Sequence, residues 1–367
     1  MGDLKNDKFL NLITWTQPKS NGQDIDPWLN ISMLNTYDLD GALGPVNAIK
    51  FLNNSLIAFQ DKGISEILYN TRTQLSTTEG VPVELGNSGK VDGVRYISNI
   101  IGCQNKWSIC QSPNGLYFTD DISKSIYLFN NSITNLSDSK GFHSWVYSNS
   151  KEGIVWNPVD FNNMVTYYDN TTGDILFITN KECLAYNELF NEFTSFYSYE
   201  RTPYIFSLTD TTGAIRPFSS YKNIYEGGYK LWKQHEGNYN DFYNVLRPYY
   251  INIIANPDPT SDKIFNNIEY RADCFYDDNT YWYDHMAFDR LEVKNEYQSN
   301  SVSLKFNRIG NSNVKKKFRT WNLLIPRDSK NNRDRMRNPW LNIMLTKNDV
   351  YTGIKTVIHD LIVHYFE

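Results

Sequence analysis

The chain has 367 residues, of which 40 % are hydrophobic and 21 % are charged, with a net charge of −5. This balance excludes an intrinsically disordered chain, and the acidic charge argues against a general nucleic-acid binder, whose surface should be basic. Twenty-six Tyr, 20 Phe and 9 Trp stand beside abundant Asn and few strong helix formers. This composition predicts many short strands joined by tight turns.

Signals for export and for membrane insertion are missing from the sequence pattern. The first nine residues are polar, and no stretch approaches the roughly 18 apolar residues of a membrane helix. We therefore expect synthesis in a cytosol, without export by the usual route and without a membrane-spanning segment. The cysteines have neither CxxC spacing nor a histidine at zinc-ligand distance, which predicts reduced, mostly buried thiols. They are Cys103, Cys110, Cys183 and Cys274.

Residues 1–49 are predicted to form an irregular lead-in. Turn-forming residues interrupt their short apolar runs at Pro18, Pro27, Gly41, Gly44 and Pro45.

Residues 50–245 contain a loose recurrence, in which an alternating strand meets an Asp, Asn or Gly turn and a second strand follows. Its clearest copies begin at Ser55, Gly115 and Asp174, about sixty residues apart. This spacing suits the four-stranded blades of a propeller with long loops, so we predict a propeller-like, multi-blade domain. A β-sandwich without closure is the alternative that the spacing leaves open.

Residues 246–367 differ from the preceding region, because their expected strands are all short and alternating. This pattern predicts a separate C-terminal β-sandwich. The last segment, from Ile354 to Tyr365, fits either a helical stripe or a closing strand, and its β-branched residues favour the strand. The other expected strands lie near residues 246–256, 268–272, 288–293, 303–306, 317–325 and 341–345.

Signatures of catalysis are incomplete wherever they occur. Residues 86–90 end like a phosphate-binding loop, but Glu84 and Val91 replace its first Gly and its Ser or Thr. Residues 36–47 lack the opening Asp and the bidentate Glu of a calcium loop. The five histidines are scattered. We therefore predict a protein that is not an enzyme and that has no catalytic residues, metal or cofactor.

Two pairs of adjacent acids, Asp120 with Asp121 and Asp277 with Asp278, have two interpretations. They match the carboxylate pair of a glycosidase, but adjacent acids in β-turns are more often solvated turn formers, which we favour. The aromatic clusters at residues 193–199 and 276–283 suit sugar stacking, a core or a permanent interface.

The charge is segregated along the chain. Residues 305–337 hold eleven Lys or Arg against two Asp, a local charge of +9 that leaves −14 for the rest. Three interpretations stay open: a solvated hairpin loop, a contact with an acidic neighbouring subunit, and a path for nucleic acid. The candidate residues for an interface or a DNA-facing surface are Lys315, Lys316, Lys317, Arg319, Arg327, Arg333, Arg335 and Arg337.

Several motifs, taken together and in order, resemble the muzzle protein family of crAss-like bacteriophages. The likeness spans nearly the whole chain, and its specificity comes from the number and order of the motifs. They include Asp26-Pro27-Trp28-Leu29, Leu56-Ile57-Ala58-Phe59-Gln60-Asp61, Gly102-Cys103-Gln104-Asn105-Lys106-Trp107-Ser108, Phe193-Thr194-Ser195-Phe196-Tyr197, Phe265-Asn266-Asn267-Ile268-Glu269, Arg337-Asn338-Pro339-Trp340 and His359-Asp360-Leu361-Ile362-Val363.

The resemblance implies a structural component of a short-tailed virion, assembled in the host bacterial cytoplasm. It implies a ring at the distal end of the tail channel that helps to close or gate it during genome delivery. The implied partners are other copies of the chain and other tail proteins, and the basic stretch adds a passing contact with exiting DNA. Proteins of this family look longer than this chain, which resembles their C-terminal part. The rival hypothesis is a carbohydrate-binding or glycoside-cleaving propeller for host receptor engagement.

Overall fold

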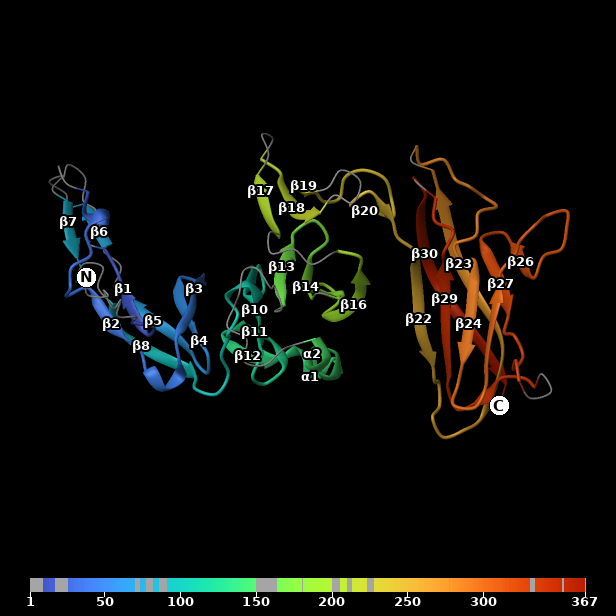
Figure 1. Cartoon of the computed structure of the whole chain (residues 1–367), viewed down its shortest axis with the longest axis horizontal. Coiled ribbons are helices and arrows are strands. Elements are labelled where there is room, and N and C mark those ends of the chain that lie inside the picture. Colours follow the sequence, from blue (N-terminus) through green and yellow to red (C-terminus); the bar gives the residue numbers. More distant parts are fainter. Residues whose placement is uncertain are drawn as a thin grey trace, which may run out of the picture. The chain divides into compact units, whose positions relative to one another are not determined.

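Alternating apolar residues with Asn and Gly at the turns make this an antiparallel β-protein, as predicted from the sequence. A computed structural model shows two units, Met1–Gln234 and His235–Glu367, each built from several sheets (Figure 1). The three-part division with boundaries after residues 49 and 245 stays a prediction. The structure describes residues 9–16, 26–69, 73–76, 82–85, 91–149, 164–179, 181–199, 205–209, 213–222, 228–276, 278–330, 334–351 and 353–366.

The first large sheet follows the chain order, and short turns join its first three strands. Its first turn places Asn53 and Asn54 at φ of 46° and 67°, a left-handed conformation that Asn tolerates. A separate hairpin of β6 (Thr73–Ser76) and β7 (Pro82–Leu85) precedes the last strand. The strands are β3 (Val46–Leu52), β4 (Ser55–Gln60), β5 (Ile64–Tyr69) and β8 (Val91–Ser98).

A hairpin packs against this sheet from within the predicted lead-in. Its strands are β1 (Leu12–Thr14) and β2 (Thr36–Asp38). Ile13 and Leu39 join Ala58 and Ile67 in one apolar cluster. Two short 3-10 helices, η1 (Pro27–Leu29) and η2 (Gly41–Leu43), flank β2. This region is therefore partly regular and contributes to the core.

Three further meander sheets follow in the first unit, and the strands predicted to begin near Ser55, Gly115 and Asp174 are confirmed. Helices η3 (Lys106–Ser108), α1 (Leu136–Ser139) and α2 (His143–Asn149) flank the second sheet. The second sheet contains β9 (Cys110–Ser112), β10 (Gly115–Asp120), β11 (Ser125–Asn130) and β12 (Ser132–Asn135). The third contains β13 (Val165–Asp169), β14 (Asp174–Ile178), β15 (Cys183–Asn187) and β16 (Glu192–Tyr197). The last contains β17 (Ile205–Thr209), β18 (Ile215–Lys222) and β19 (Tyr229–Lys233).

Successive sheets share cores because their strands are apolar on both faces. On β10, Phe118 packs with Phe59 of the preceding sheet, whereas its neighbour Tyr117 packs with Phe177 of the following one. Another cluster joins Ile178 of the third sheet to Ile205 of the last. The result is a series of meander sheets in chain order. Its closure into a propeller stays a prediction.

The junction between the first two sheets depends on Gly102. The amide of Cys103 donates to the Gln60 carbonyl over 2.9 Å, and the side chain of Gln104 donates to the Asp61 carbonyl. A Cβ on Gly102 would overlap the backbone of Gln60 and Asp61.

We expect Gly102→Ala to lower the free energy of unfolding of the first unit by about 1–3 kcal/mol, because the backbone must move apart. Urea unfolding followed by circular dichroism measures the change. Gly93 is the matched control, because a Cβ there meets nothing within 4 Å. An equal effect of Gly93→Ala would contradict the steric explanation.

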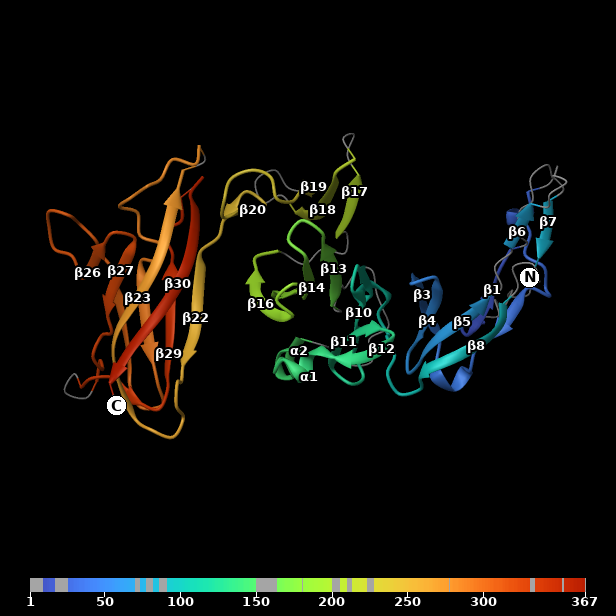
Figure 2. The ribbon, with the colours of Figure 1, turned by 180° about the vertical axis from the view of Figure 1, so that it is seen from behind.

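In the second unit, two sheets enclose a single core (Figure 2). A small hairpin, β20 (Asp241–Phe242) with β21 (Val245–Leu246), precedes them. The first sheet has the order β22 (Tyr249–Ala255), β29 (Leu341–Lys347), β24 (Arg290–Lys294) and β25 (Ser299–Ser303). In the second, β26 (Val314–Lys317) and β27 (Thr320–Leu324) lead to β23 (Lys263–Phe275), which also pairs with β28 (Arg337–Asn338) and β30 (Lys355–Phe366).

The structure of the second unit tests two of the predicted strands. The last segment is the strand β30, paired along β23, so the preference for a strand over a helix is confirmed. The strand predicted near residues 303–306 was wrong in its extent, because β25 ends at Ser303. Leu304 turns into the core and its amide donates to the Asp289 carbonyl over 2.7 Å.

Candidate functional site

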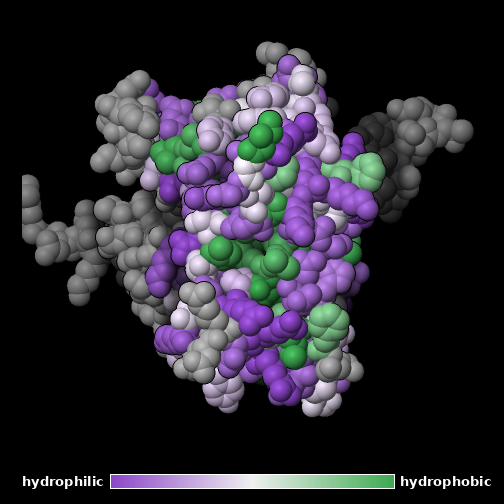
Figure 3. Space-filling model, turned by 90° about the vertical axis from the view of Figure 1, so that its right-hand side faces the viewer, coloured by the Kyte–Doolittle hydropathy of each residue, from purple (hydrophilic) through white to green (hydrophobic). Residues whose placement is uncertain are grey.

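The predicted basic residues are spread over a strand, a turn and a loop of the second unit. Lys315, Lys316 and Lys317 lie on β26, Arg319 follows in the turn, and Arg337 begins β28. Arg327 and Arg335 are exposed on the connection from β27 to β28. Arg333 lies outside the described residues. Figure 3 shows the second unit from the side that is on the right in Figure 1. Hydrophobic side chains gather on this side among hydrophilic ones.

Lys316 differs from its neighbours because aromatic rings surround its ammonium group. The Nζ atom lies 3.7 Å from the ring centroid of Tyr283 and 4.5 Å from that of Trp321, and it donates to the Tyr283 carbonyl. Partial burial lowers the pKa of Lys316 below its usual value. These contacts tie β26 to the loop before β24, so we assign Lys316 a structural role.

Local carboxylates neutralise part of the basic stretch. Arg319 lies 3.5 Å from the Asp273 carboxylate, and Arg337 lies 3.6 Å from that of Asp262. Arg308 contacts Asp284 at 2.9 Å. Each arginine side chain is more than half exposed, so these ion pairs contribute little to stability.

Lys315 and Lys317 are exposed on the outer face of the sheet. Lys315 is opposite Asn322, and Lys317 is opposite Thr320. Side chains alternate between the faces of a strand, so both lysines share the side of exposed Leu324, whereas Leu323 points into the core. The structure therefore brings two predicted basic residues together with an apolar side chain.

The acid pair Asp120 and Asp121 is buried, which corrects the expectation that these residues are solvated. Asp120 accepts hydrogen bonds from the amide of Ile122 at 2.9 Å and from the side chains of Gln104 and Ser123 at 3.0 Å. The amide of Asp121 donates to Gln104 over 2.7 Å. These bonds hold the turn after β10, so the turn-forming interpretation fits better than the glycosidase one.

The second acid pair is only partly described. Asp277 lies outside the described residues. Asp278 accepts the Thr280 amide at 2.8 Å, and hydrogen bonds from Thr280 lower the pKa of its carboxyl group. This is also turn chemistry.

The cysteines are buried free thiols, as predicted. Burial raises the pKa of Cys103 to about 12, so this thiol is protonated and unreactive at neutral pH. Within the described part of the chain, no three His, Cys, Asp or Glu side chains converge as a metal site would require. No helix of the described residues is long and apolar enough to cross a membrane.

His285 is packed within an aromatic cluster. Its ring stacks on Trp282 at a centroid distance of 4.2 Å and meets the edge of Tyr351 at 5.7 Å. Burial, with a smaller contribution from the charge of Lys347, lowers the pKa of His285 from 6.5 to about 4.

We expect His285 to make the second unit less stable as the pH falls from about 6.5 to about 4. In this window the unfolded histidine binds a proton that the folded one does not, so acid favours unfolding. Urea unfolding at several pH values measures the slope. His285→Gln should flatten it, whereas His143→Gln, at an exposed position of α2, should not. An unchanged slope in His285→Gln would contradict the assignment.

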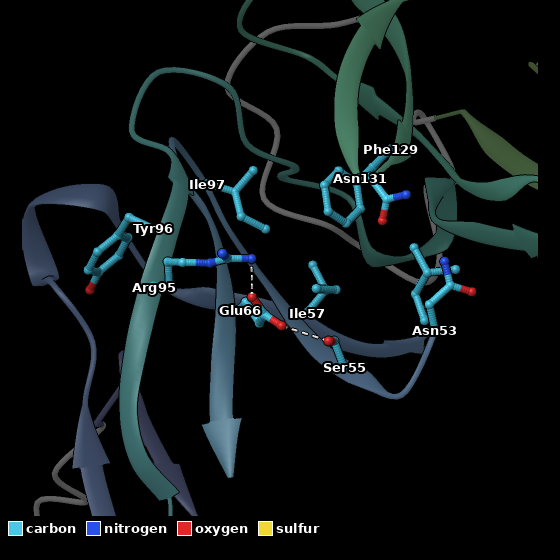
Figure 4. Close-up of a pocket in the computed structure, with 10 residues that line it drawn as sticks. Asn53, Ser55, Ile57, Glu66, Arg95, Tyr96, Ile97, Phe129 and Asn131 are labelled. Carbon is cyan, nitrogen blue, oxygen red and sulfur yellow. Dashed lines mark hydrogen bonds and ion pairs between the residues drawn. The ribbon is translucent and has the colours of Figure 1, made fainter.

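A cleft of about 470 Å³ opens between the first two sheets, and sequence reasoning missed it (Figure 4). Glu66 lies at its wall, bound to Arg95 at 2.5 Å and to the Ser55 hydroxyl at 2.6 Å. The lining combines apolar residues with amides and one ion pair. It comprises Leu52, Asn53, Ser55, Ile57, Glu66, Arg95, Tyr96, Ile97, Phe129 and Asn131. These residues come from separate stretches near residues 52–66, 95–97 and 129–131, so no single local motif marks the cleft.

Comparison with known proteins agrees with the motifs. The family model described as "Crassvirus muzzle protein" matches residues 3–217, and the model of the "Crassvirus muzzle protein C-terminal domain" matches residues 237–328. The chain belongs to the Crassvirus muzzle protein family. A curated "Muzzle protein" of Bacteroides phage crAss001 is 44 % identical over 359 residues, which are 98 % of this chain. The matched region is 25 % of this relative, so the chain spans about a quarter of its length.

Proposed function

We propose that this chain is a structural protein of a short phage tail, assembled in the host bacterial cytoplasm. It forms a ring at the distal end of the tail channel and helps to close or gate the channel during genome delivery. The observation that carries the proposal is the match of both units to muzzle family models.

The fold supports an architectural role on physical grounds. Meander sheets that share apolar cores on both faces, as β10 does through Tyr117 and Phe118, make a rigid body that resists local opening. A ring subunit needs such rigidity, since small errors in the angle between neighbours prevent closure. Propeller closure within a chain is part of this proposal.

We place the exposed basic residues Lys315 and Lys317 at a contact with another copy or another tail protein. Charges across such a contact set register and orientation more than affinity. Passing contact with exiting DNA is the alternative use of the same face. For DNA, the dissociation constant of the wild-type chain for a duplex should rise steeply with salt. A salt-independent constant would exclude this use.

Immunogold labelling of intact virions tests the proposed location. An antibody against the chain should label the end of the tail opposite the capsid, with one cluster of gold per particle. Labelling of the capsid surface or of lateral fibres would contradict the proposal. Virions that lack the chain by mass spectrometry would also contradict it.

The cleft favours a second candidate function, the binding of host carbohydrate. Its apolar floor and its polar rim of Asn53, Arg95 and Asn131 combine the contacts that sugars use. A glycan array with the wild-type chain and Arg95→Ala tests this candidate, and Lys50→Ala is the control. Glycan binding that Arg95→Ala abolishes would support it. The absence of binding, or binding equal in both variants, would exclude the cleft as a glycan site.

A further inference from the structure

The tip of the β1–β2 hairpin carries an unusual run of exposed apolar side chains. We call Trp28, Leu29, Ile31, Met33 and Leu34 the hairpin tip. Their exposed fractions are 63 %, 87 %, 55 %, 94 % and 89 %. Several large apolar side chains with this exposure in one short segment are typical of a surface that another molecule covers.

The hairpin tip is held in place by the residues at its two ends. The Asp26 carboxylate accepts the Trp28 amide at 3.1 Å and caps η1. At the other end, the Trp15 amide donates to the carbonyl of buried Asn35 over 3.2 Å. The free chain has therefore already lost part of the conformational entropy that ordering this segment on binding would otherwise cost.

The described sequence that contains the hairpin tip is acidic. Among the described residues from Phe9 to Gly44 there are three carboxylates and no Lys or Arg. Asp38 and Asp40 are both exposed at the base of the hairpin. A surface that covers the tip should therefore combine apolar side chains with positive charge.

The second unit has a surface of this kind. We call Lys315, Lys317, Phe318 and Leu324 the β26–β27 face. Phe318 is 78 % exposed in the turn and Leu324 is 68 % exposed on β27. The two lysines lie on the same outer side as Leu324. Both lysines are exposed, unlike Lys316, whose ammonium group is held by aromatic rings.

We infer that the hairpin tip of one copy docks on the β26–β27 face of a second copy, an inference that rests on the proposed ring. The apolar side chains supply contact area, and Asp38 and Asp40 oppose Lys315 and Lys317. Because the two surfaces differ, the contact is heterologous. Such a contact closes a ring when the rotation between successive copies returns to the first copy, which the proposed ring requires.

The edge of the sheet argues for docking through side chains. Among the described strands, β26 is at the edge of its sheet, and it is four residues long and contains three lysines. Short, lysine-rich edges resist pairing with a further strand. A neighbour therefore meets the outer face here, where Leu324 is exposed, with Phe318 exposed in the adjoining turn.

Isotope-mixed cross-linking tests the inference directly. Equal amounts of ¹⁴N- and ¹⁵N-labelled full chain are mixed, treated with a zero-length carbodiimide and digested for mass spectrometry. We expect mixed-isotope links from Asp38 or Asp40 to Lys315 or Lys317. Links between these residues that carry one isotope only would overturn the inference. The same holds if these residues form no links in samples that sediment as oligomers.

Variants at the two surfaces test the energetics by analytical ultracentrifugation. Leu29→Asp should raise the dissociation constant for self-association more than about tenfold, because it places a charge in the apolar contact. Lys317→Glu should raise it about three- to tenfold, and Asp38→Lys mixed with Lys317→Glu should recover part of the loss. Lys294→Glu, on β24 of the opposite sheet, is the matched control and should change nothing.

The results that would overturn the docking differ from those that would overturn the proposed function. Unchanged self-association in Leu29→Asp and Lys317→Glu would overturn the docking, as would a chain that stays monomeric at its highest soluble concentration. Both variants are at exposed positions, so thermal unfolding should match the wild type. Cross-links in virions from the hairpin tip to another protein would also overturn the docking. Gold labelling at the tail end would preserve the proposed function in each case.

Discussion

Trp321→Ala should lower the free energy of unfolding of the second unit by about 3–5 kcal/mol, the range for truncating a large aromatic in a core. Trp321 is fully buried on β27, where its ring lies parallel to that of Tyr270 at a centroid distance of 6.2 Å. Phe306 packs against it edge-on at 5.0 Å, and Lys316 covers it at 4.5 Å. The substitution leaves a cavity and also removes the ring that holds the lysine. Urea unfolding followed by circular dichroism measures the loss.

Leu324→Ala on the same strand is the control for this prediction. Its side chain is 68 % exposed, so its removal should change the stability of the second unit by less than about 0.5 kcal/mol. Similar losses for Trp321→Ala and Leu324→Ala would show that the two sheets do not enclose the core described above.

Phe118→Ala should destabilise the first unit by about 3–5 kcal/mol, because Phe118 joins two sheets. Its ring contacts Phe59 of the preceding sheet at a centroid distance of 5.2 Å and stacks on Tyr127 of its own sheet at 5.5 Å. Truncation removes contacts on both sides at once. The transition of the first unit should move to lower urea concentration.

Phe51→Ala provides a control with the same chemical change. Phe51 is on β3 and is 49 % exposed, so its truncation should cost far less than that of Phe118. If both variants unfold at the same urea concentration, the shared core between the first two sheets is not a source of stability.

The strands were predictable where local pattern decides the structure. Around Ser55 and Gly115, alternating apolar residues meet Asn or Asp turns, and the pairing partner follows within a few residues. The strand β30 was also predictable, because β-branched residues pack well on a pleated surface. In contrast, β1 and β2 are three residues each and are joined by a long connection. Ile13 of β1 and Leu39, just after β2, pack with Ala58 and Ile67, a contact that no local pattern indicates.

The candidate sites were less predictable because long-range contacts define them. The sequence marked Lys315, Lys316 and Lys317 as equivalent, but Tyr283, 33 residues before Lys316, separates the middle lysine from the other two. The burial of Asp120 depends on Gln104, 16 residues away. Counting charges along the chain identifies a basic region. Only the fold shows which of its side chains are exposed and can contact a partner.

Cryo-electron microscopy of the intact tail tests the central claim, a structural ring at the distal end of the channel. We expect density for the meander sheets, with Phe118 between the first two, repeated around the channel axis at the end opposite the capsid. Density for this chain in lateral fibres or on the capsid, or a single unrepeated copy at the tail end, would show that the chain does not form this ring.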